Sequence, residues 1–352
     1  MLPTIKLVLD GRNYGGIEAH VCQLYHRLTL SGRKVEVLLI SSYPESSFIL
    51  QLKMQKVAFV ELIGSSYQKL SQLKHHHRHG ILHAHGYKAS ILCRLATLGS
   101  GRPCVTTFHN GDPGKGKLAF YLWMDQLTSP LSLNLAVSRA IQARVGDNCR
   151  LIRNWVSQPT ALKSGFGRPF SLGFAGRLCA DKGFDRYVAL ARSLPQYHWH
   201  SFGDGELAHL VEGGGVIHHG QVNDLPRRLV DLDALVLPSR YEGLPMVALE
   251  AMACGVPVIA FDVGDLSQLV DNQVGRLVDA GDMKAMAQSI TEMAAQPLPR
   301  LRTLSANART RIARHWSGRS SLALCLRLYR QCGADTGKIT DAPRSTIRDK
   351  QA

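Results

Sequence analysis

Residues 239–258 read SRYEGLPMVALEAMACGVPV, and this stretch decides the fold of the chain. One short apolar run precedes it and another follows it, as expected of two buried strands. Pro245 suits the first turn of a helix, and Gly255 suits its carboxyl end. The stretch therefore predicts a strand, a loop, a helix over Met246–Cys254 and a second strand, which is the repeating unit of a parallel α/β sheet.

Two glutamates frame this unit at a spacing that indicates a binding function. Glu242 precedes the helix and Glu250 lies eight residues later. Eight residues are close to two helical turns, so the two side chains share roughly one face. Free backbone N–H groups from Gly243 onward open the helix. Carboxylates at this spacing suit paired hydrogen bonds to the vicinal hydroxyls of a sugar or a ribose.

The same alternation of apolar runs and helix-like stretches extends over the whole chain. Near-continuous apolar strands separated by helices indicate parallel sheets covered on both faces. The expected strands of the first half are Ile5–Leu9, Val35–Ile40, Ala58–Leu62, Ile81–Ala84, Cys104–Phe108, Leu133–Val137 and Cys149–Ile152. Those of the second half are Ser171–Ala175, His198–Phe202, Val216–His218, Ala234–Leu237, Val256–Phe261 and Gly275–Val278. Further helices are expected at Ile17–Leu30, Ala89–Leu98, Phe184–Ser193 and Met283–Ala295.

This pattern predicts an α/β protein with two doubly wound domains in tandem. Residues 157–168 are rich in proline and glycine and lack apolar periodicity, so they are the expected join. The domains are then 1–160 and 166–320, with a polar, flexible tail over 336–352. Two such sheets leave a cleft between their carboxyl ends, and functional residues are expected there, just after strands.

Composition excludes several classes of protein. The 352 residues are 45% apolar and 20% charged, which fits a soluble globular chain rather than a disordered one. No run approaches the roughly 18 apolar residues of a membrane span. The amino terminus gains charge too early for a signal peptide. The eight cysteines are scattered without a Cys-x-x-Cys pair, as expected of buried free thiols in a reducing compartment. A disulfide scaffold, a zinc cluster and secretion are not expected, and the cytoplasm is the expected location.

The positive charge belongs to the first half of the chain. Residues 1–165 carry 20 Lys and Arg against 8 Asp and Glu, a net charge of +12. Residues 166–335 carry 18 against 17, and the tail carries 4 against 2. A one-sided positive field indicates an anionic partner, such as nucleic acid, a phosphorylated substrate or a membrane surface. A solvated basic surface that serves solubility is the alternative.

Three motifs of the first half follow expected strands. Gly15 and Gly16 open a helix, where free N–H groups favour an anion such as a phosphate. His109 ends a strand before Asn-Gly and could contact a hydroxyl or carbonyl in the cleft. Asn154 precedes the join and could also face the cleft. The alternatives are a plain turn for the glycines and Asn154, and a structural histidine for His109. The tract 75–79, HHHRH, is interpreted as a solvated basic face rather than a metal site.

The second half carries two further motifs. Arg177 and Lys182 lie in one loop after an expected strand, beside Gly176 and Gly183. Two cations in such a loop can clamp a diphosphate and stabilise the charge of a departing phosphate. The alternative is surface ion pairing with the nearby aspartates. Gly203 follows the next strand and could either approach a nucleotide or form a tight turn.

Taken together, these residues resemble the retaining GT-B glycosyltransferases of group 1, also called family 4. The likeness covers nearly the whole chain. It is most specific in the block from Glu242 to Val258 and moderate elsewhere, including Gly176-Arg177-Leu with Lys182-Gly183, and Thr107-Phe-His109. It implies a GT-B fold, two Rossmann-like domains facing each other, and a helix over 321–335 that packs back on the first domain.

The resemblance also implies roles for individual residues. Arg177 and Lys182 would contact the donor diphosphate, and Glu250 the ribose. Glu242, with the N–H groups of Gly243 and Leu244, would hold the donor sugar. From the other domain, Gly16 would approach the phosphates and His109 the sugar near its reacting carbon. Catalytic roles are thus expected for His109, Arg177, Lys182 and Glu242, and donor binding for Gly15, Gly16, Asn154, Arg177, Lys182, Gly203, Glu242, Gly243, Leu244 and Glu250. No metal and no cofactor are expected, because cationic side chains and a helix terminus do the electrostatic work.

The sequence departs from the family at two places. Trp155 stands where glycine commonly follows the asparagine, and the loop 111–117 matches poorly. Competing hypotheses are a GT-B epimerase, a longer phosphorylase, a non-catalytic nucleotide-sugar-binding subunit and a nucleic-acid-binding protein. The last would require aromatics interleaved with basic residues, and no nucleic acid is expected because aromatics are only 7% of the chain.

The expected partners are a UDP- or GDP-linked sugar, a glycan or lipid-linked acceptor and, through residues 1–165, an anionic membrane surface. The expected process is bacterial surface polysaccharide or lipopolysaccharide synthesis, with the enzyme peripheral on the inner face of the plasma membrane. The expected docking residues are basic side chains of the first half, namely Arg33, Lys34, Lys53, Lys56, Lys69, Lys74, Arg78, Lys115 and Lys117.

Overall fold

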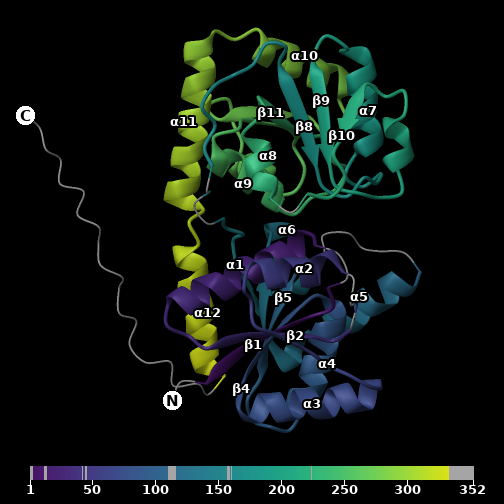
Figure 1. Cartoon of the computed structure of the whole chain (residues 1–352). Helices are drawn as coiled ribbons and strands as arrows, with labels where there is room; N and C mark the ends of the chain where they lie inside the picture. Colours follow the sequence, from purple (N-terminus) through teal and green to yellow (C-terminus); the bar gives the residue numbers. More distant parts are fainter. Residues whose placement is uncertain are drawn as a thin grey trace, which may run out of the picture.

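A computed structural model describes residues 3–11, 14–41, 43, 46–109, 116–156, 159, 161–222 and 224–332. The tail 336–352, the join around 157–160 and Lys115 therefore lie wholly or partly outside the described residues. The described chain forms two α/β domains, one above the other in Figure 1. Each is built on one parallel sheet.

The first domain contains a seven-stranded parallel sheet in the order β3-β2-β1-β4-β5-β6-β7. The order reverses between β1 and β4, and this switch point is where such sheets bind ligands. Leu9, the last residue of β1, pairs with His85, which ends β4. The strands are β1 (Thr4–Leu9), β2 (Val35–Leu39), β3 (Phe59–Glu61), β4 (Gly80–His85), β5 (Cys104–Phe108), β6 (Ser132–Ala136) and β7 (Cys149–Leu151). The helices are α1 (Gly16–Leu30), α2 (Ser47–Met54), α3 (Ser66–Arg78), α4 (Tyr87–Thr97), α5 (Lys117–Leu127) and α6 (Arg139–Val145).

The second domain has a six-stranded parallel sheet in the order β10-β9-β8-β11-β12-β13. Its switch point lies between β8 and β11. The strands are β8 (Ser171–Ala175), β9 (His198–Phe202), β10 (Val216–His218), β11 (Ala234–Leu237), β12 (Val258–Phe261) and β13 (Gly275–Val278). The helices are α7 (Phe184–Ser193), α8 (Leu225–Leu229), α9 (Met246–Cys254), α10 (Met283–Ala294) and α11 (Leu298–His315).

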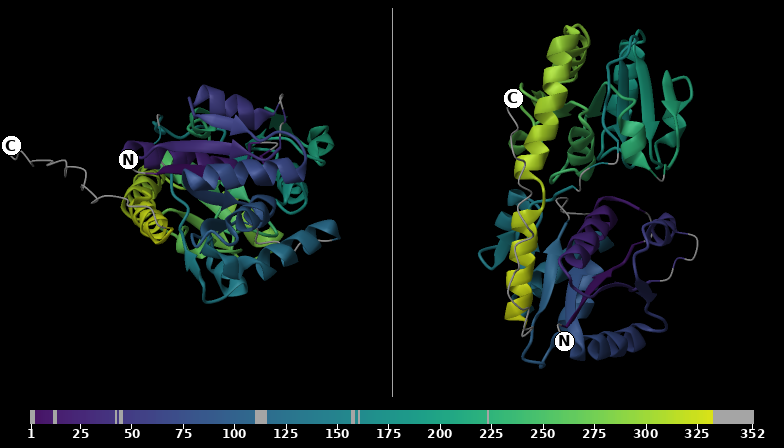
Figure 2. Two further views of the ribbon diagram at one scale, coloured as in Figure 1. Left: turned by 90° about the horizontal axis from the view of Figure 1, so that it is seen from below. Right: turned by 60° about the vertical axis from the view of Figure 1, so that its left-hand side comes forward.

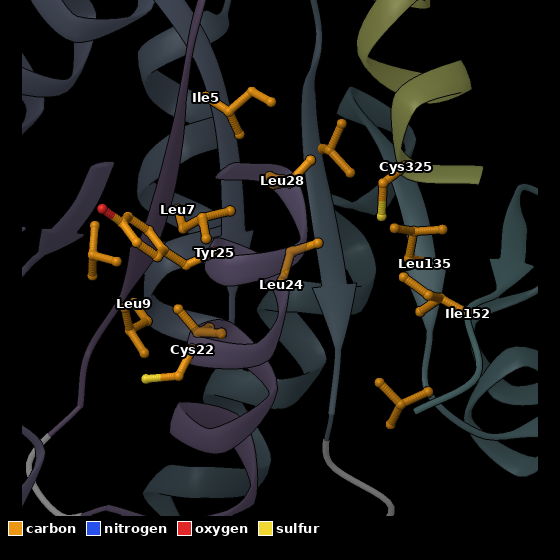
Figure 3. Packing of buried hydrophobic residues seen from close by; sticks show 14 of the residues in the cluster. Ile5, Leu7, Leu9, Cys22, Leu24, Tyr25, Leu28, Leu135, Ile152 and Cys325 are labelled. Atoms are coloured by element: carbon orange, nitrogen blue, oxygen red, sulfur yellow. The ribbon is translucent and has the colours of Figure 1, made fainter. Parts of the chain in front are cut away.

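The last helix, α12 (Arg319–Gln331), returns to the first domain after α11 has run along the second. Figures 1 and 2 show the two helices end to end along one side of the molecule. Cys325, Leu326, Leu328 and Tyr329 of α12 are buried in the same core cluster as β1 and α1. Figure 3 shows Cys325 beside Leu135 of β6 in this cluster. The carboxyl end of the described chain thus completes the core of its amino-terminal domain.

Elements differ from the sequence expectations mainly at their ends. The strand expected at Val256–Phe261 begins at Val258, because Gly255 ends α9 in a left-handed conformation and Pro257 has no N–H to donate to a sheet. The sequence did not single out α5, whose residues Phe120, Tyr121 and Trp123 are exposed. All eight cysteines are free and buried, as their scatter indicated.

Candidate functional site

The switch point of the second sheet brings together one cation and one carboxylate from the motifs. Lys182 follows β8, and Glu242 follows β11. The Lys182 Nζ atom lies 2.7 Å from Glu242 Oε2, and Ser239 donates a hydrogen bond of 2.9 Å from its hydroxyl to Glu242 Oε1. The Glu242 carboxylate is nearly buried and Lys182 is 30% exposed. Both oxygens of Glu242 are therefore held, in an orientation that the sequence could not specify.

Two glycines allow the loops of this switch point to approach each other. Gly183 adopts φ +71°, and a Cβ there would lie 2.0 Å from the carbonyl oxygen of Pro238, after β11. Gly203 adopts φ +123°, and a Cβ there would lie 2.0 Å from the carbonyl oxygen of Gly176. Side chains at these positions would push the loops apart. Glycine at position 203 thus allows the loop after β9 to pack against the loop that carries Arg177.

Arg177 is the exposed cation of this loop, and its guanidinium makes no hydrogen bond or ion pair within the part of the chain that the structure describes. The nearby Asp185 is instead bound by both terminal nitrogens of Arg240, each at 2.7 Å. Surface ion pairing with this aspartate therefore does not explain Arg177. Its guanidinium is free to bind an anion at the end of β8.

Glu250 is half-buried and lies in the second turn of α9. Glu242 lies before the helix, which begins at Met246, so the two glutamates do not share one helical face as the sequence spacing predicted. Burial raises the pKa of Glu250 to about 7. The pKa of Tyr14, in the loop after β1, is raised by burial and further by neighbouring groups that include Glu250. Helices α1 and α9 are also in contact. A carboxylate held out of water in this way gains from a ligand that donates hydrogen bonds to it.

The two glycines that open α1 differ in their surroundings. The N–H of Gly15 donates a 3.1 Å hydrogen bond to Glu18 Oε2, and burial raises the pKa of Glu18 to about 7. A Cβ at Gly16 would meet nothing within 4 Å among the described atoms. Gly16 is therefore open to a ligand, whereas the N–H of Gly15 is already bound by a carboxylate.

Asn154 joins the two domains. Its amide Nδ2 donates a 2.8 Å hydrogen bond to the carbonyl oxygen of Leu244, and its Oδ1 lies 3.0 Å from His20 Nδ1. Nδ2 of Asn154 is the donor of its amide, and Oδ1 can only accept a hydrogen bond. Nδ1 of His20 must therefore be the donor to Oδ1, so it carries the proton of the His20 ring. The unusual Trp155 packs against the His20 ring, with centroids 4.8 Å apart, and against Gly318. Asn154 therefore fixes the loop that follows Glu242.

His109 is half-buried and lies in a cluster with three buried histidines, His20, His83 and His85, at the switch point of the first sheet. Its Nε2 lies 3.1 Å from Nδ1 of His85, and the His20 ring packs edge-on against it, with centroids 5.0 Å apart. His83 bonds Thr107 and the hydroxyl of Tyr329 in α12. Burial, followed by the neighbouring imidazoles His20 and His83, lowers the pKa of His109 well below its usual value. His109 is consequently a neutral imidazole at neutral pH.

A cavity of about 200 Å³ lies beside His109 in the first domain. It is lined by Phe108, Leu122, Trp123, Gln126 and Arg144, among other residues from β5, α5 and α6. It is partly apolar and adjoins the exposed aromatic side of α5. This cavity could receive part of an organic ligand next to His109.

The structure places the motif residues in two groups that face the domain boundary. Lys182, Glu242 and Ser239 form one, and the histidines around His109 form the other, linked through Asn154 and Leu244. Sequence reasoning missed Ser239 and His20. His20 had one available signal, which is its place on the buried face of α1 one turn after Gly16.

Comparisons with known proteins agree with this geometry. The family model "Glycosyltransferase Family 4" matches residues 14–156, and "Glycosyl transferases group 1" matches residues 169–296. Together the two matches cover most of the chain. The chain therefore belongs to the group 1 glycosyltransferases, and its two tandem α/β domains are those of the GT-B fold.

Two curated relatives and two solved structures illustrate the likeness. The chain is 32% identical over 166 residues to the lipopolysaccharide core mannosyltransferase LpsB of Rhizobium meliloti, covering 42% of this chain and 47% of that protein. It is 29% identical over 239 residues to TuaC of Bacillus subtilis, a putative teichuronic acid glycosyltransferase, covering 60% of each. HepE of Anabaena, solved with UDP and glucose, superposes with a TM-score of 0.78 at 20% identity over 92% of this chain and 98% of its own. TarM of S. aureus superposes with a TM-score of 0.80 at 13% identity over 93% and 100%.

The raised pKa of Glu250 predicts a specific pH dependence of stability. Between the ordinary pKa of 4.5 and the folded value of about 7, the folded protein binds a proton that the unfolded chain releases, so stability falls as pH rises through this window. We expect Glu250→Gln to raise the Tm at about pH 8 and to change it little at about pH 5. Calorimetry at both pH values measures this. The exposed Glu212→Gln is the control, and an equal Tm change at both pH values for Glu250→Gln would contradict the assignment.

Proposed function

We propose that this protein transfers a sugar, with retention of its anomeric configuration, from a nucleotide sugar to a glycan or lipid-linked acceptor. The donor base is uracil or guanine. The observation that carries the proposal is the switch point of the second sheet, where free Arg177, Lys182 and the oriented Glu242 lie ahead of the half-buried Glu250. The process that we propose is the synthesis of bacterial surface polysaccharide or lipopolysaccharide. The relatives named for lipopolysaccharide, teichuronic acid and capsule synthesis support this.

Each part of the donor has a chemical counterpart in the site. The Glu250 carboxylate accepts hydrogen bonds from the two ribose hydroxyls, which offsets the cost of its burial. Arg177 and Lys182 bind the diphosphate. Lys182 exchanges its ion pair with Glu242 for the phosphate, and Glu242, still held by Ser239, then accepts from hydroxyls of the sugar. The backbone N–H groups of Gly243 and Leu244 bind the same sugar, and Gly16 approaches the phosphates from the first domain.

The reaction breaks the bond between the anomeric carbon and the diphosphate oxygen, and forms one between that carbon and an acceptor hydroxyl. Positive charge develops on the sugar ring while negative charge develops on the leaving diphosphate. The two cations stabilise the diphosphate, and the diphosphate oxygen takes the acceptor's proton as attack occurs on the same face. Because His109 is neutral, it can contact the sugar without repelling the positive ring. We propose that no metal takes part in this chemistry.

The acceptor binds on the side of the first domain. The cavity lined by His109 supports this, because an acceptor bound in it would present its hydroxyl next to His109. Its apolar lining from β5 and α5 suits an acceptor that carries a hydrophobic group as well as a sugar. The exposed rings of Phe120 and Trp123 extend this apolar surface outward from the cavity.

A lipid-linked acceptor requires contact with a membrane, and we propose that the first domain makes it. None of the described helices is long and apolar enough to cross a bilayer. The exposed Lys53 and Lys56 flank the end of α2, near the exposed Met54, and Lys69 and Lys74 lie on α3. Basic side chains gain roughly 1 kcal/mol each near an anionic bilayer, and the exposed apolar side chains can enter the headgroup region. The expected place of action is the inner face of the plasma membrane.

Nucleotide binding distinguishes the proposed roles of Glu242 and Glu250. We expect UDP or GDP, but not ADP, to raise the Tm of the full chain, because a ligand that binds only the folded state stabilises it by mass action. Glu250→Ala should weaken this shift, since it removes ribose contacts. Glu242→Ala should keep it and lower turnover with the complete donor. Titration calorimetry with the bare nucleotide checks both variants, and equal losses of affinity would overturn the assignment.

Turnover depends on the cations of the β8 loop. Arg177→Ala and Lys182→Ala should each lower kcat about a hundredfold or more, the typical cost of losing one charge-stabilising group. Arg192→Ala, an exposed arginine on α7, should leave kcat unchanged. Release of nucleoside diphosphate from the donor in the presence of acceptor measures the rate, and proton NMR gives the anomeric configuration of the product. Activity should survive EDTA. Inversion, or an activity lost with EDTA and restored by Mg²⁺ or Mn²⁺, would refute the proposed chemistry.

Membrane docking predicts binding to anionic vesicles at low salt that weakens as salt rises. Changing Lys53, Lys56, Lys69 and Lys74 to Glu should abolish co-sedimentation with phosphatidylglycerol vesicles. The matched control is Arg192→Glu with Lys284→Glu, two exposed basic residues of the second domain. If the wild-type protein stays in the supernatant with anionic vesicles at low salt, or if the control variant loses binding equally, docking through this surface is wrong.

A further inference from the structure

The histidine cluster contains more ligand capacity than the proposed reaction uses. One ring nitrogen from each of His20, His85 and His109 lies within 4.8 Å of the others. This is the one group of three such side chains with metal-ligand spacing among the described residues. The tract 75–79 does not form another within that part of the chain; it is a solvated face only in part, because His77 is buried and bonds Ser100. The three residues come from α1, β4 and the end of β5, so the fold, not local sequence, brings them together.

Two nitrogens of the cluster are buried without a partner. Nε2 of His20 and Nε2 of His85 make no hydrogen bond to any described group, although each side chain is about 99% buried. An unpaired buried nitrogen costs free energy, so it marks a place where a partner is missing. The proton of His20 is on Nδ1, where it is donated to Asn154. Its Nε2 therefore presents a lone pair inward.

This arrangement has the features of a histidine metal site. A metal-bound imidazole almost always donates its second N–H to an oxygen, and His20 does so to Asn154 Oδ1. Zn²⁺ binds imidazole at about 2.0–2.1 Å in a tetrahedron, which places ligand nitrogens about 3.3 Å apart. Nδ1 of His85 and Nε2 of His109 are already 3.1 Å apart in a hydrogen bond, which a cation would replace, so only His20 has to move closer. The unpaired Nε2 of His85 lies on the other side of its ring and would carry the proton. Three histidines with a fourth open position form an established type of zinc site.

The donor set of this site is three imidazole nitrogens. Hard cations such as Mg²⁺ prefer oxygen ligands, so the site would take a borderline cation.

We propose that His20, His85 and His109 form a binding site for a borderline divalent cation of the zinc type at the domain boundary. The bound cation uses His109 as a ligand and fills the space beside its ring. If His109 contacts the donor sugar as proposed above, the bound cation inhibits transfer, and a chelator relieves the inhibition. Metal binding itself rests on the cluster geometry alone. The site is thus compatible with a transfer reaction that uses no metal.

Cobalt absorption tests the binding independently of activity. The full chain, freed of metal by EDTA and then of EDTA, is titrated with Co²⁺. We expect one equivalent to give the intense visible absorption of a tetrahedral complex, and Zn²⁺ to displace it. His20→Gln and His85→Gln should each weaken binding roughly 10–100-fold or more, by comparison with the effect of losing outer-shell partners. His200→Gln, from a histidine pair of the second domain with a 3.0 Å contact to His219, is the matched control and should bind as wild type.

X-ray absorption at the zinc edge tests the ligand set without any variant. The zinc-loaded wild-type chain should show three imidazole nitrogens at about 2.0 Å and no sulfur. A sulfur ligand, an octahedral cobalt spectrum, or equal affinity in the wild type and in His20→Gln would overturn the proposal. Zinc inhibition of turnover is measured separately. Tight binding without inhibition would leave the site intact and refute the role of His109 in the reaction, whereas turnover without zinc binding would refute only the site.

Discussion

The buried amide of Asn154 is the contact on which the arrangement of the site depends. Its Oδ1 accepts a hydrogen bond from His20 in α1, and its Nδ2 donates a hydrogen bond to the carbonyl oxygen of Leu244 in the second domain. A single side chain thus sets the tautomer of a first-domain histidine and the position of the loop that carries Glu242. Because both bonds are buried, replacing the amide would leave polar atoms unpaired on both sides of the boundary.

Around this contact, the two domains contribute opposite kinds of chemistry. The second domain supplies the charged groups, with Arg177 free and Lys182 held against Glu242. The first domain supplies neutral imidazoles, kept uncharged by burial at the end of its sheet. The proposed reaction, which separates charge between a sugar and a leaving phosphate, suits this division, since the cations would face the phosphate and the neutral imidazoles would face the sugar together with Glu242.

The last helix of the described chain stabilises the histidine cluster of the first domain. Helix α12 buries Tyr329 and Cys325 in the core of the first domain, and the Tyr329 hydroxyl bonds His83 of the histidine cluster. Gly318, at the start of this helix, packs on Trp155, which in turn packs on His20. The carboxyl-terminal helix therefore supports the same histidines that face the domain boundary.

The sequence by itself determined the class of fold, and it predicted most of the residues that the structure gathers at the candidate site of the second domain. Apolar runs and the block from Glu242 to Val258 are local patterns, and the physics that they report, burial of strands and capping of helices, is also local. The partners of the motif residues were not determined in this way. These pairings depend on which groups reach each other in space. Lys182 pairs with Glu242, Arg240 pairs with Asp185, and the N–H of Gly15 donates to Glu18. The histidine cluster is the clearest case, because His20, His85 and His109 stand far apart in the chain. Only the parallel sheet, which aligns the ends of β4 and β5 beside α1, brings their nitrogens within 4.8 Å.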